Sequence, residues 1–212
     1  TELNLDSGRV EADASKQTFP GTGFKVTTPV AVAGLRGTSF RLNMAEDGKT
    51  LRNEVLEGGV AIGAQGQDVV VGSGQGTLAE AGKPPQAPRP LLPAPEAGGL
   101  PDRVAEVPVR FAWRADPNAE AWRAQIARDP EFREVVFDNV YWQPVASWRE
   151  PGADGRYYLR LRAIDGVGLE GLSRDHAFEL DAQPLPPQAR EPEDGQRLAS
   201  GAASLVWDPS EA

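Results

Sequence analysis

The sequence predicts an all-β protein, and three features of the chain support this class. Apolar side chains alternate with polar or small ones in many short runs, a period of two that puts them on one face of a strand. Glycine and proline are frequent, at 23 and 19 of 212 residues, which favours many tight turns over long helices. Turns that contain glycine follow one another closely, as expected for a sandwich or a solenoid-like coil of short strands.

Residues 26–42 are expected to form the central strands of the first part of the chain. Alternate valines in its first half predict one strand, and the alternation that restarts after Gly34 predicts a second strand with Phe40 and Leu42 on one face. Gly34 and Gly37 bracket the corner between them, where the backbone is free to bend. We therefore expect two consecutive strands joined at a glycine hinge.

Further strands are expected on both sides of this run. Asp47 and Gly48 both tolerate positive φ, which predicts a hairpin turn before the next strand. The other short alternating runs of this part lie at 3–12, 50–55, 60–62 and 69–71.

Four stretches of the first part resemble the FecR domain, a periplasmic family. They are T-P-V-A-V-A-G-L-R-G-T-S-F at 28–40, S-G-R-V-E-A at 7–12, E-V-L-E-G-G-V-A at 54–61 and V-G-S-G-Q-G at 71–76. The resemblance implies a FecR-like β domain at 1–82. Family members normally begin with further strands, so we expect this chain to lack the N-terminal strands of the domain.

A proline-rich segment follows at 83–101. It contains K-P-P-Q-A-P-R-P at 83–90, a composition typical of a semi-rigid polyproline spacer. Because proline cannot donate to a sheet ladder, we expect this linker to separate two domains.

Residues 102–183 predict an immunoglobulin-like sandwich. Val109, Phe111 and Trp113 alternate, and Y-Y-L-R-L-R-A-I-D at 157–165 alternates along its whole length. The Y-x-L-R-L-R-A-I-D pattern, followed by closely spaced glycines, resembles the last two strands of a fibronectin type III domain. We also expect Trp113 to lie in the core.

The tail, 184–212, repeats the order proline-rich linker, acidic turn, then an alternating strand that ends in Trp and Asp-Pro. Trp207 corresponds to Trp113 in this comparison. We interpret the tail as a linker and the first strand of a second, truncated sandwich.

Residues with reactive side chains are present, but none forms a constellation typical of an enzyme. The single histidine, His176, lacks a G-x-S-x-G partner motif, and Asp165 is one acid where a calcium loop needs several. The glycine-rich run 72–76 lacks the spacing of a phosphate loop. Glu54 is expected to pair with Arg52 or Arg36. The sequence therefore predicts a non-enzymatic protein without cofactor or metal.

Four residues remain as binding candidates. Arg36 lies between the two corner glycines. Its guanidinium group either donates hydrogen bonds to buried carbonyls of this domain or contacts a partner protein. Tyr141, Trp142 and Trp148 lie among polar residues, and they either form an exposed cluster that stacks on sugars or anchors a protein, or they pack under a loop.

The amino-acid composition limits the classes of partner that this chain can bind. With 22 basic and 31 acidic residues the net charge is −9, which disfavours nucleic acid because phosphate contacts need cations. The absence of cysteine excludes disulfides and cysteine-ligated metals. No apolar run approaches the ~20 residues of a membrane-spanning helix, so we expect no direct membrane contact by this chain. Any targeting or anchoring segment is expected to lie outside it.

The FecR resemblance implies a place in the periplasm of a Gram-negative bacterium and a role in envelope signalling. There such domains relay the state of an outer-membrane iron transporter to a sigma factor. Members followed by sandwich modules tend to carry a peptidoglycan-binding LysM module upstream. We expect an interaction, scaffold or signalling module that contacts an envelope protein, peptidoglycan or another polysaccharide. The alternatives are carbohydrate binding through the sandwich aromatics and an anti-sigma-type regulator of iron transport.

Overall fold

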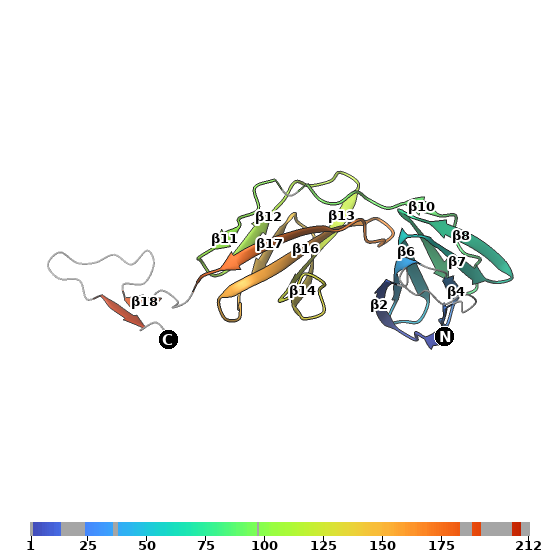
Figure 1. Cartoon of the computed structure of the whole chain (residues 1–212), viewed down its shortest axis with the longest axis horizontal. Coiled ribbons are helices and arrows are strands. Elements are labelled where there is room, and N and C mark those ends of the chain that lie inside the picture. The colour runs from blue at the N-terminus through green and yellow to red at the C-terminus, as the bar shows by residue number, and fades with distance from the viewer. Residues whose placement is uncertain are drawn as a thin grey trace.

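The computed structural model describes residues 2–13, 24–35, 38–96, 98–182, 188–191 and 205–208. The described part is all-β, as predicted, and its strands form several sheets (Figure 1). Nowhere in these residues is there a helix able to cross a membrane.

The first domain is a sandwich of two five-stranded sheets. Almost all neighbouring strands pair antiparallel, so the structure takes the sandwich form and not the solenoid-like one. One sheet has the order β1 (Glu2–Asn4), β3 (Phe24–Thr27), β4 (Val32–Leu35), β7 (Gly59–Ala64), β8 (Gln67–Gly72). The other has the order β10 (Arg89–Pro90), β9 (Gln75–Glu80), β6 (Thr50–Glu57), β5 (Ser39–Met44), β2 (Gly8–Asp13).

The expected single strand in the first half of 26–42 is wrong, because the chain turns back within it as the β3–β4 hairpin. Thr28 Oγ1 accepts a hydrogen bond from the Ala31 amide at 3.0 Å, and Pro29 has no amide to donate to a ladder. The hairpin register places Val26 opposite Ala33, and both are fully buried.

The expected glycine corner between Gly34 and Gly37 falls partly outside the described residues, and Gly34 itself belongs to β4. Two other expectations for this region are confirmed. Phe40 and Leu42 are buried on the core face of β5. The turn between β5 and β6 contains Gly48 at φ 67°, and the Lys49 amide donates to Asp47 Oδ1 at 3.0 Å. Local turn chemistry therefore sets this hairpin.

The second domain packs a five-stranded sheet against a two-stranded sheet around its own apolar cluster. Trp113 is 7% exposed, as predicted for a core residue. Tyr157 is buried and its hydroxyl donates to the Ala153 carbonyl at 2.7 Å, the geometry of the tyrosine corner of immunoglobulin-like sandwiches. The larger sheet has the order β11 (Arg103–Val104), β17 (Arg174–Leu180), β16 (Gly155–Asp165), β13 (Ala119–Ala127), β14 (Val135–Tyr141), and the smaller pairs β12 (Val109–Ala112) with β15 (Val145–Trp148).

The proline-rich segment lies along both domains (Figure 1). It contributes β10 to the first domain, where Pro90 occupies the sheet edge that a proline tolerates. On the other side, the Leu172 amide donates to the Leu92 carbonyl at 2.9 Å. The segment thus connects the two domains by hydrogen bonds as well as by the chain.

A short antiparallel pair ends the described chain, formed by β18 (Gln188–Glu191) and β19 (Val206–Asp208). Trp207 is 58% exposed, in contrast to the buried Trp113 to which it corresponds in sequence.

Candidate functional site at the junction between the domains

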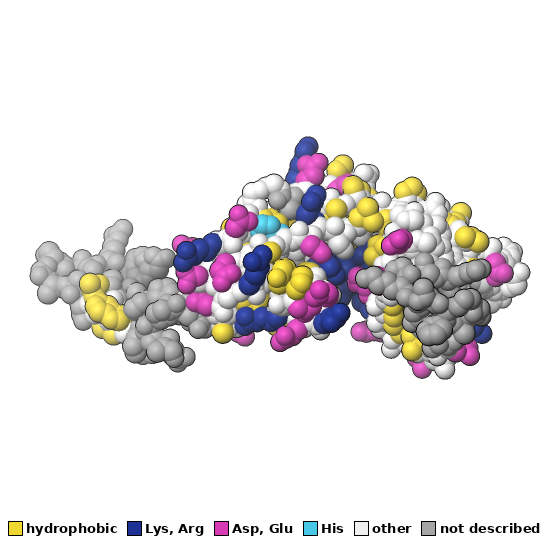
Figure 2. Space-filling model, in the orientation of Figure 1, with side chains coloured by type: hydrophobic (Ala, Val, Ile, Leu, Met, Phe, Trp, Pro, Cys, Tyr) yellow, Lys and Arg dark blue, Asp and Glu magenta, His cyan; other side chains and the backbone are white. Residues whose placement is uncertain are grey.

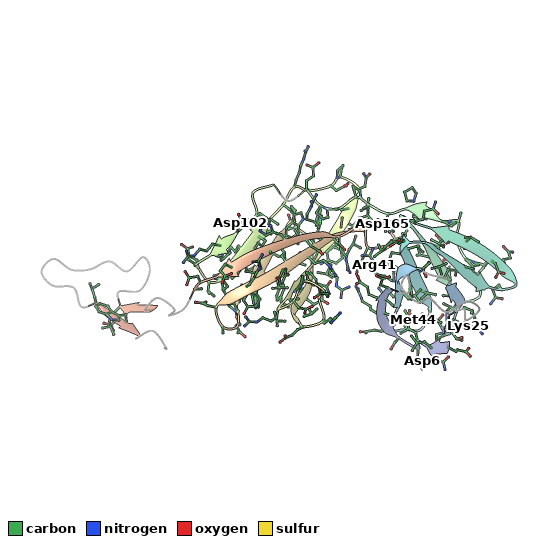
Figure 3. All side chains as sticks on the ribbon, viewed as in Figure 1. Asp6, Lys25, Arg41, Met44, Asp102 and Asp165 are labelled. Atoms are coloured by element: carbon green, nitrogen blue, oxygen red, sulfur yellow. The ribbon has the colours of Figure 1, made fainter. Side chains whose placement is uncertain are left out.

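Charged residues of both domains meet where the loop 165–173, between β16 and β17, lies on the sheet of β2, β5, β6 and β9 (Figure 3). Figure 2 shows basic side chains coming to the surface at this junction. The loop enters the junction because Gly168, at φ 84°, and the Asp165 side chain shape a tight turn. Asp165 Oδ1 accepts hydrogen bonds from the amides of Val167 and Leu169.

Glu170 is the centre of the junction, with its side chain only 6% exposed. Its carboxylate pairs with Arg123 at 3.0 Å, with Arg162 at 3.1 Å, and with Arg9 of the other domain. We call these four residues the Glu170 cluster. Burial by itself would raise the pKa of Glu170, but these three guanidinium groups, together with that of Arg41, lower it to about 2. The carboxylate is therefore ionised at neutral pH.

Arg162 joins carboxylates of both domains. Its side chain is 1% exposed, and Nη2 lies 2.8 and 2.9 Å from the two carboxylate oxygens of Glu11 on β2. The same guanidinium donates to Glu170 through Nη1. Because a guanidinium has a planar fork of donors, it can bind two carboxylates at once, which a lysine at this position could not do in the same way.

Arg41 and Glu54 of the first domain form hydrogen bonds with the backbone of the loop 165–173. Arg41 Nη2 donates to the carbonyls of Glu170 and Gly171 at 2.7 and 2.8 Å, and Glu54 Oε1 accepts from the Glu170 amide at 3.0 Å. Burial raises the pKa of Glu54 to about 7, although Arg41 at 3.5 Å acts in the opposite direction. Among the described residues Arg41, and not the expected Arg52, is thus the partner of Glu54, and the other expected partner, Arg36, lies outside them.

Close backbone contacts complete the junction. Arg52 Nε donates to the Val167 carbonyl at 2.8 Å, and Leu169 is 1% exposed. A Cβ added to Gly76 would lie 3.1 Å from Leu169 Cδ1, and one added to Gly171 would lie 2.6 Å from the Leu92 carbonyl oxygen. Both glycines are therefore needed for the close approach of the loop.

The change Gly171→Ala is expected to lower the free energy of unfolding by about 1–3 kcal/mol, because the new methyl group collides with backbone at Leu92. Urea unfolding followed by tryptophan fluorescence measures this. Gly98→Ala is the matched control, since nothing lies within 4 Å of the added Cβ. Equal stabilities of the two variants would contradict the close contact.

The raised pKa of Glu54 predicts a pH dependence of stability. The folded protein binds the Glu54 proton more tightly than the unfolded chain, whose pKa is near 4.5. The stabilisation is therefore complete below pH 4.5 and falls as pH rises towards 7, by roughly 3 kcal/mol in total. Unfolding free energies measured between about pH 5 and pH 8 test this, since Glu170 stays ionised there.

Glu54→Gln should remove this decline, because the amide does not titrate over that range. The exposed Glu106→Gln should keep it. A decline of the same size in Glu54→Gln would assign the effect to another group.

The structure places the predicted binding residues in different surroundings. Arg36 lies outside the described residues. Trp148 is 6% exposed in the core, beside Tyr157 with ring centroids 5.2 Å apart. The Tyr141 hydroxyl is hydrogen-bonded to Ser147, whereas Trp142 is 73% exposed. The three aromatic residues thus do not share one exposed face.

His176 lies against the linker, with Nε2 3.1 Å from the Pro101 carbonyl oxygen. No group of three or more His, Asp or Glu side chains suited to a metal occurs in the part of the chain that the structure describes.

The residues of the Glu170 cluster and its neighbours were missed from the sequence. Arg41 and Arg162 occupy the positions of their strands that alternation assigns to the solvent side. Their burial depends on the other domain, and no local pattern signals it.

The fold and the junction define a two-domain all-β protein whose domains are held together by a charged interface. Residues 1–61 match the model of the FecR protein family. No curated protein matches the chain. Matching solved structures include that of a candidate anti-sigma factor from Parabacteroides distasonis ATCC 8503, with 12% identity and a TM-score of 0.37. That match covers 44% of this chain and 50% of the other, so this chain spans about half the length of that neighbour.

Proposed function

We propose that this protein is a non-enzymatic interaction, scaffold or signalling module of the Gram-negative cell envelope and acts in the periplasm. The match of residues 1–61 to the FecR protein family carries this proposal. The same stretch contains the motif segments at 7–12, 28–40 and 54–61. The partner is an envelope protein.

The junction supports a role in which two domains act as one unit. The Glu170 cluster ties the FecR-like sheet to the second sandwich through Arg9 and Glu170, which are 161 positions apart in sequence. A docked pair of domains presents a composite surface of fixed geometry, which suits a scaffold or a relay. We take the second domain to be a fibronectin type III-like module, consistent with its two sheets and its tyrosine corner.

An anti-sigma-type regulator of iron-transport signalling is the second candidate, and the same family match favours it. The two candidates differ in their consequences. A regulator changes the transcription of genes under one sigma factor, whereas a scaffold changes the integrity of the envelope without a change in that set of genes.

The test uses the source bacterium with the full gene tagged on its chromosome. We expect the protein either in the fraction released by osmotic shock or, if the full protein is anchored, in the envelope fraction, and a protein found in the cytosol would overturn both candidates. Deletion followed by RNA sequencing separates them: altered transcripts of one sigma-dependent set support the regulator, and unchanged transcripts with increased detergent sensitivity support the scaffold. Complementation with Gly171→Ala, against Gly98→Ala, then shows whether the docked arrangement is required.

A further inference from the structure

A groove of about 590 Å³ runs between the two domains, beside the Glu170 cluster. Its volume lies in the range of roughly 300–1,000 Å³ usual for ligand clefts. One wall is the outer face of β5, β6 and β9 in the first domain, and the other is the end of β14 with the start of the loop 165–173. A ligand here would contact both domains.

The wall on the second domain carries an exposed aromatic surface. Trp142 is 73% exposed, and the neighbouring Val140 is 38% exposed. Tryptophan is usually well buried, so an indole open to solvent at the edge of a groove is a candidate for stacking on a flat apolar ligand face.

The wall on the first domain carries free hydrogen-bonding groups. Asn43 and Thr50 line the groove, and within the described chain neither side chain has a hydrogen-bond partner. Gln86 lines the groove as well and is part of a small network with Glu80. The site therefore combines one exposed indole ring with several neutral hydrogen-bond donors and acceptors. A sugar can stack its apolar ring face on the indole and form hydrogen bonds with the polar groups through its hydroxyls.

The charged side chains that line the groove distinguish between neutral and anionic sugars. The guanidiniums of Arg9 and Arg52 line the groove, but both are bound to the loop 165–173. The carboxylates of Glu80 and Glu120 face the same space. Glu80 also pairs with Lys83 at 3.2 Å, but the carboxylates that line the groove still outnumber its guanidiniums, so the groove suits an uncharged ligand better than an anionic polymer.

An extended peptide fits less well. Peptides commonly bind by adding a strand to a free sheet edge, where backbone groups are unpaired. The groove wall is instead the face of β5, β6 and β9, and each of these strands is paired on both sides. That wall therefore offers only side chains, which favours hydroxyl groups as the ligand edge, while β14 on the opposite wall is the edge strand of its own sheet.

We propose that this groove binds a neutral oligosaccharide, with one ring stacked on Trp142 and its hydroxyls hydrogen-bonded to Asn43 and Thr50. The site is independent of the envelope role proposed above and uses only Trp142 of the three aromatic candidates. Because both domains contribute, bound sugar also stabilises the docked arrangement and raises the unfolding temperature.

Isothermal titration calorimetry with chitotetraose and cellotetraose tests the proposal, with oligogalacturonate as the anionic probe. We expect saturable binding of at least one neutral probe, and Trp142→Ala should weaken it roughly tenfold or more. Trp207→Ala is the matched control, since Trp207 is also exposed but does not line the groove, and it should bind as the unchanged protein does. Asn43→Ala should weaken binding without a change in unfolding temperature of the free protein.

The proposal is overturned by any of three results. These are no saturable binding of either neutral probe, neutral binding that survives Trp142→Ala, or tighter binding of oligogalacturonate than of both neutral probes. Peptides selected from a library that require Trp142, in the absence of sugar binding, would also replace the sugar as the occupant. None of these results bears on the location of the protein in the envelope or on its transcriptional effect.

Discussion

Replacing Glu170 with alanine is expected to lower the free energy of unfolding by about 3–5 kcal/mol, the cost usual for removing one partner of a buried ion pair. The change leaves the guanidiniums of Arg9, Arg123 and Arg162 without their shared carboxylate. Arg162 loses most, because its side chain is 1% exposed and water cannot replace the missing charge. Glu11 remains to pair with it, so the loss should stay within this range.

Urea unfolding at neutral pH measures this effect, with Glu106→Ala as the control because Glu106 is exposed. Glu170→Gln should fall between the two, since it keeps the side-chain volume but not the charge. The unchanged protein should show the same dependence in acid: the contribution of Glu170 is complete above its ordinary pKa of 4.5 and is lost as pH falls towards 2. If Glu170→Ala is as stable as Glu106→Ala, the cluster does not hold the domains together.

Trp148→Ala is expected to cost about 3–5 kcal/mol, the usual range for emptying the site of a large buried aromatic. The indole packs edge-on against Tyr157 at 5.2 Å and lies 6.2 Å from Phe137. Alanine would leave a cavity in the core of the second domain and remove the ring contacts.

Trp142, the exposed tryptophan nearby in the sequence, should affect stability much less than the buried Trp148. Trp142→Ala should change stability by no more than about 0.5 kcal/mol, because the indole is 73% exposed. Thermal unfolding followed by circular dichroism distinguishes the two variants directly. Similar losses in both, or a larger loss for Trp142→Ala, would show that the assignment of Trp148 to the core and Trp142 to the surface is wrong.

Much of the fold could be predicted from local pattern. Alternation identified the core face of β5 at Phe40 and Leu42, and Asp47-Gly48 identified the turn that follows. The β3–β4 hairpin was missed because the alternation of small and branched residues continues through its turn. There Pro29 and the Thr28 hydroxyl, not a change of period, reverse the chain.

The sequence by itself determined the all-β class, the positions of several turns and the apolar face of strands such as β5. Only the tertiary structure decided that Arg41, Arg162 and Glu170 are buried at the junction. The physical reason is that a period of two separates an apolar face from a polar one but does not say what covers the polar face. A face packed against charged groups of a distant segment has the same local pattern as a face in water, because its arginines and glutamates satisfy one another in place of solvent.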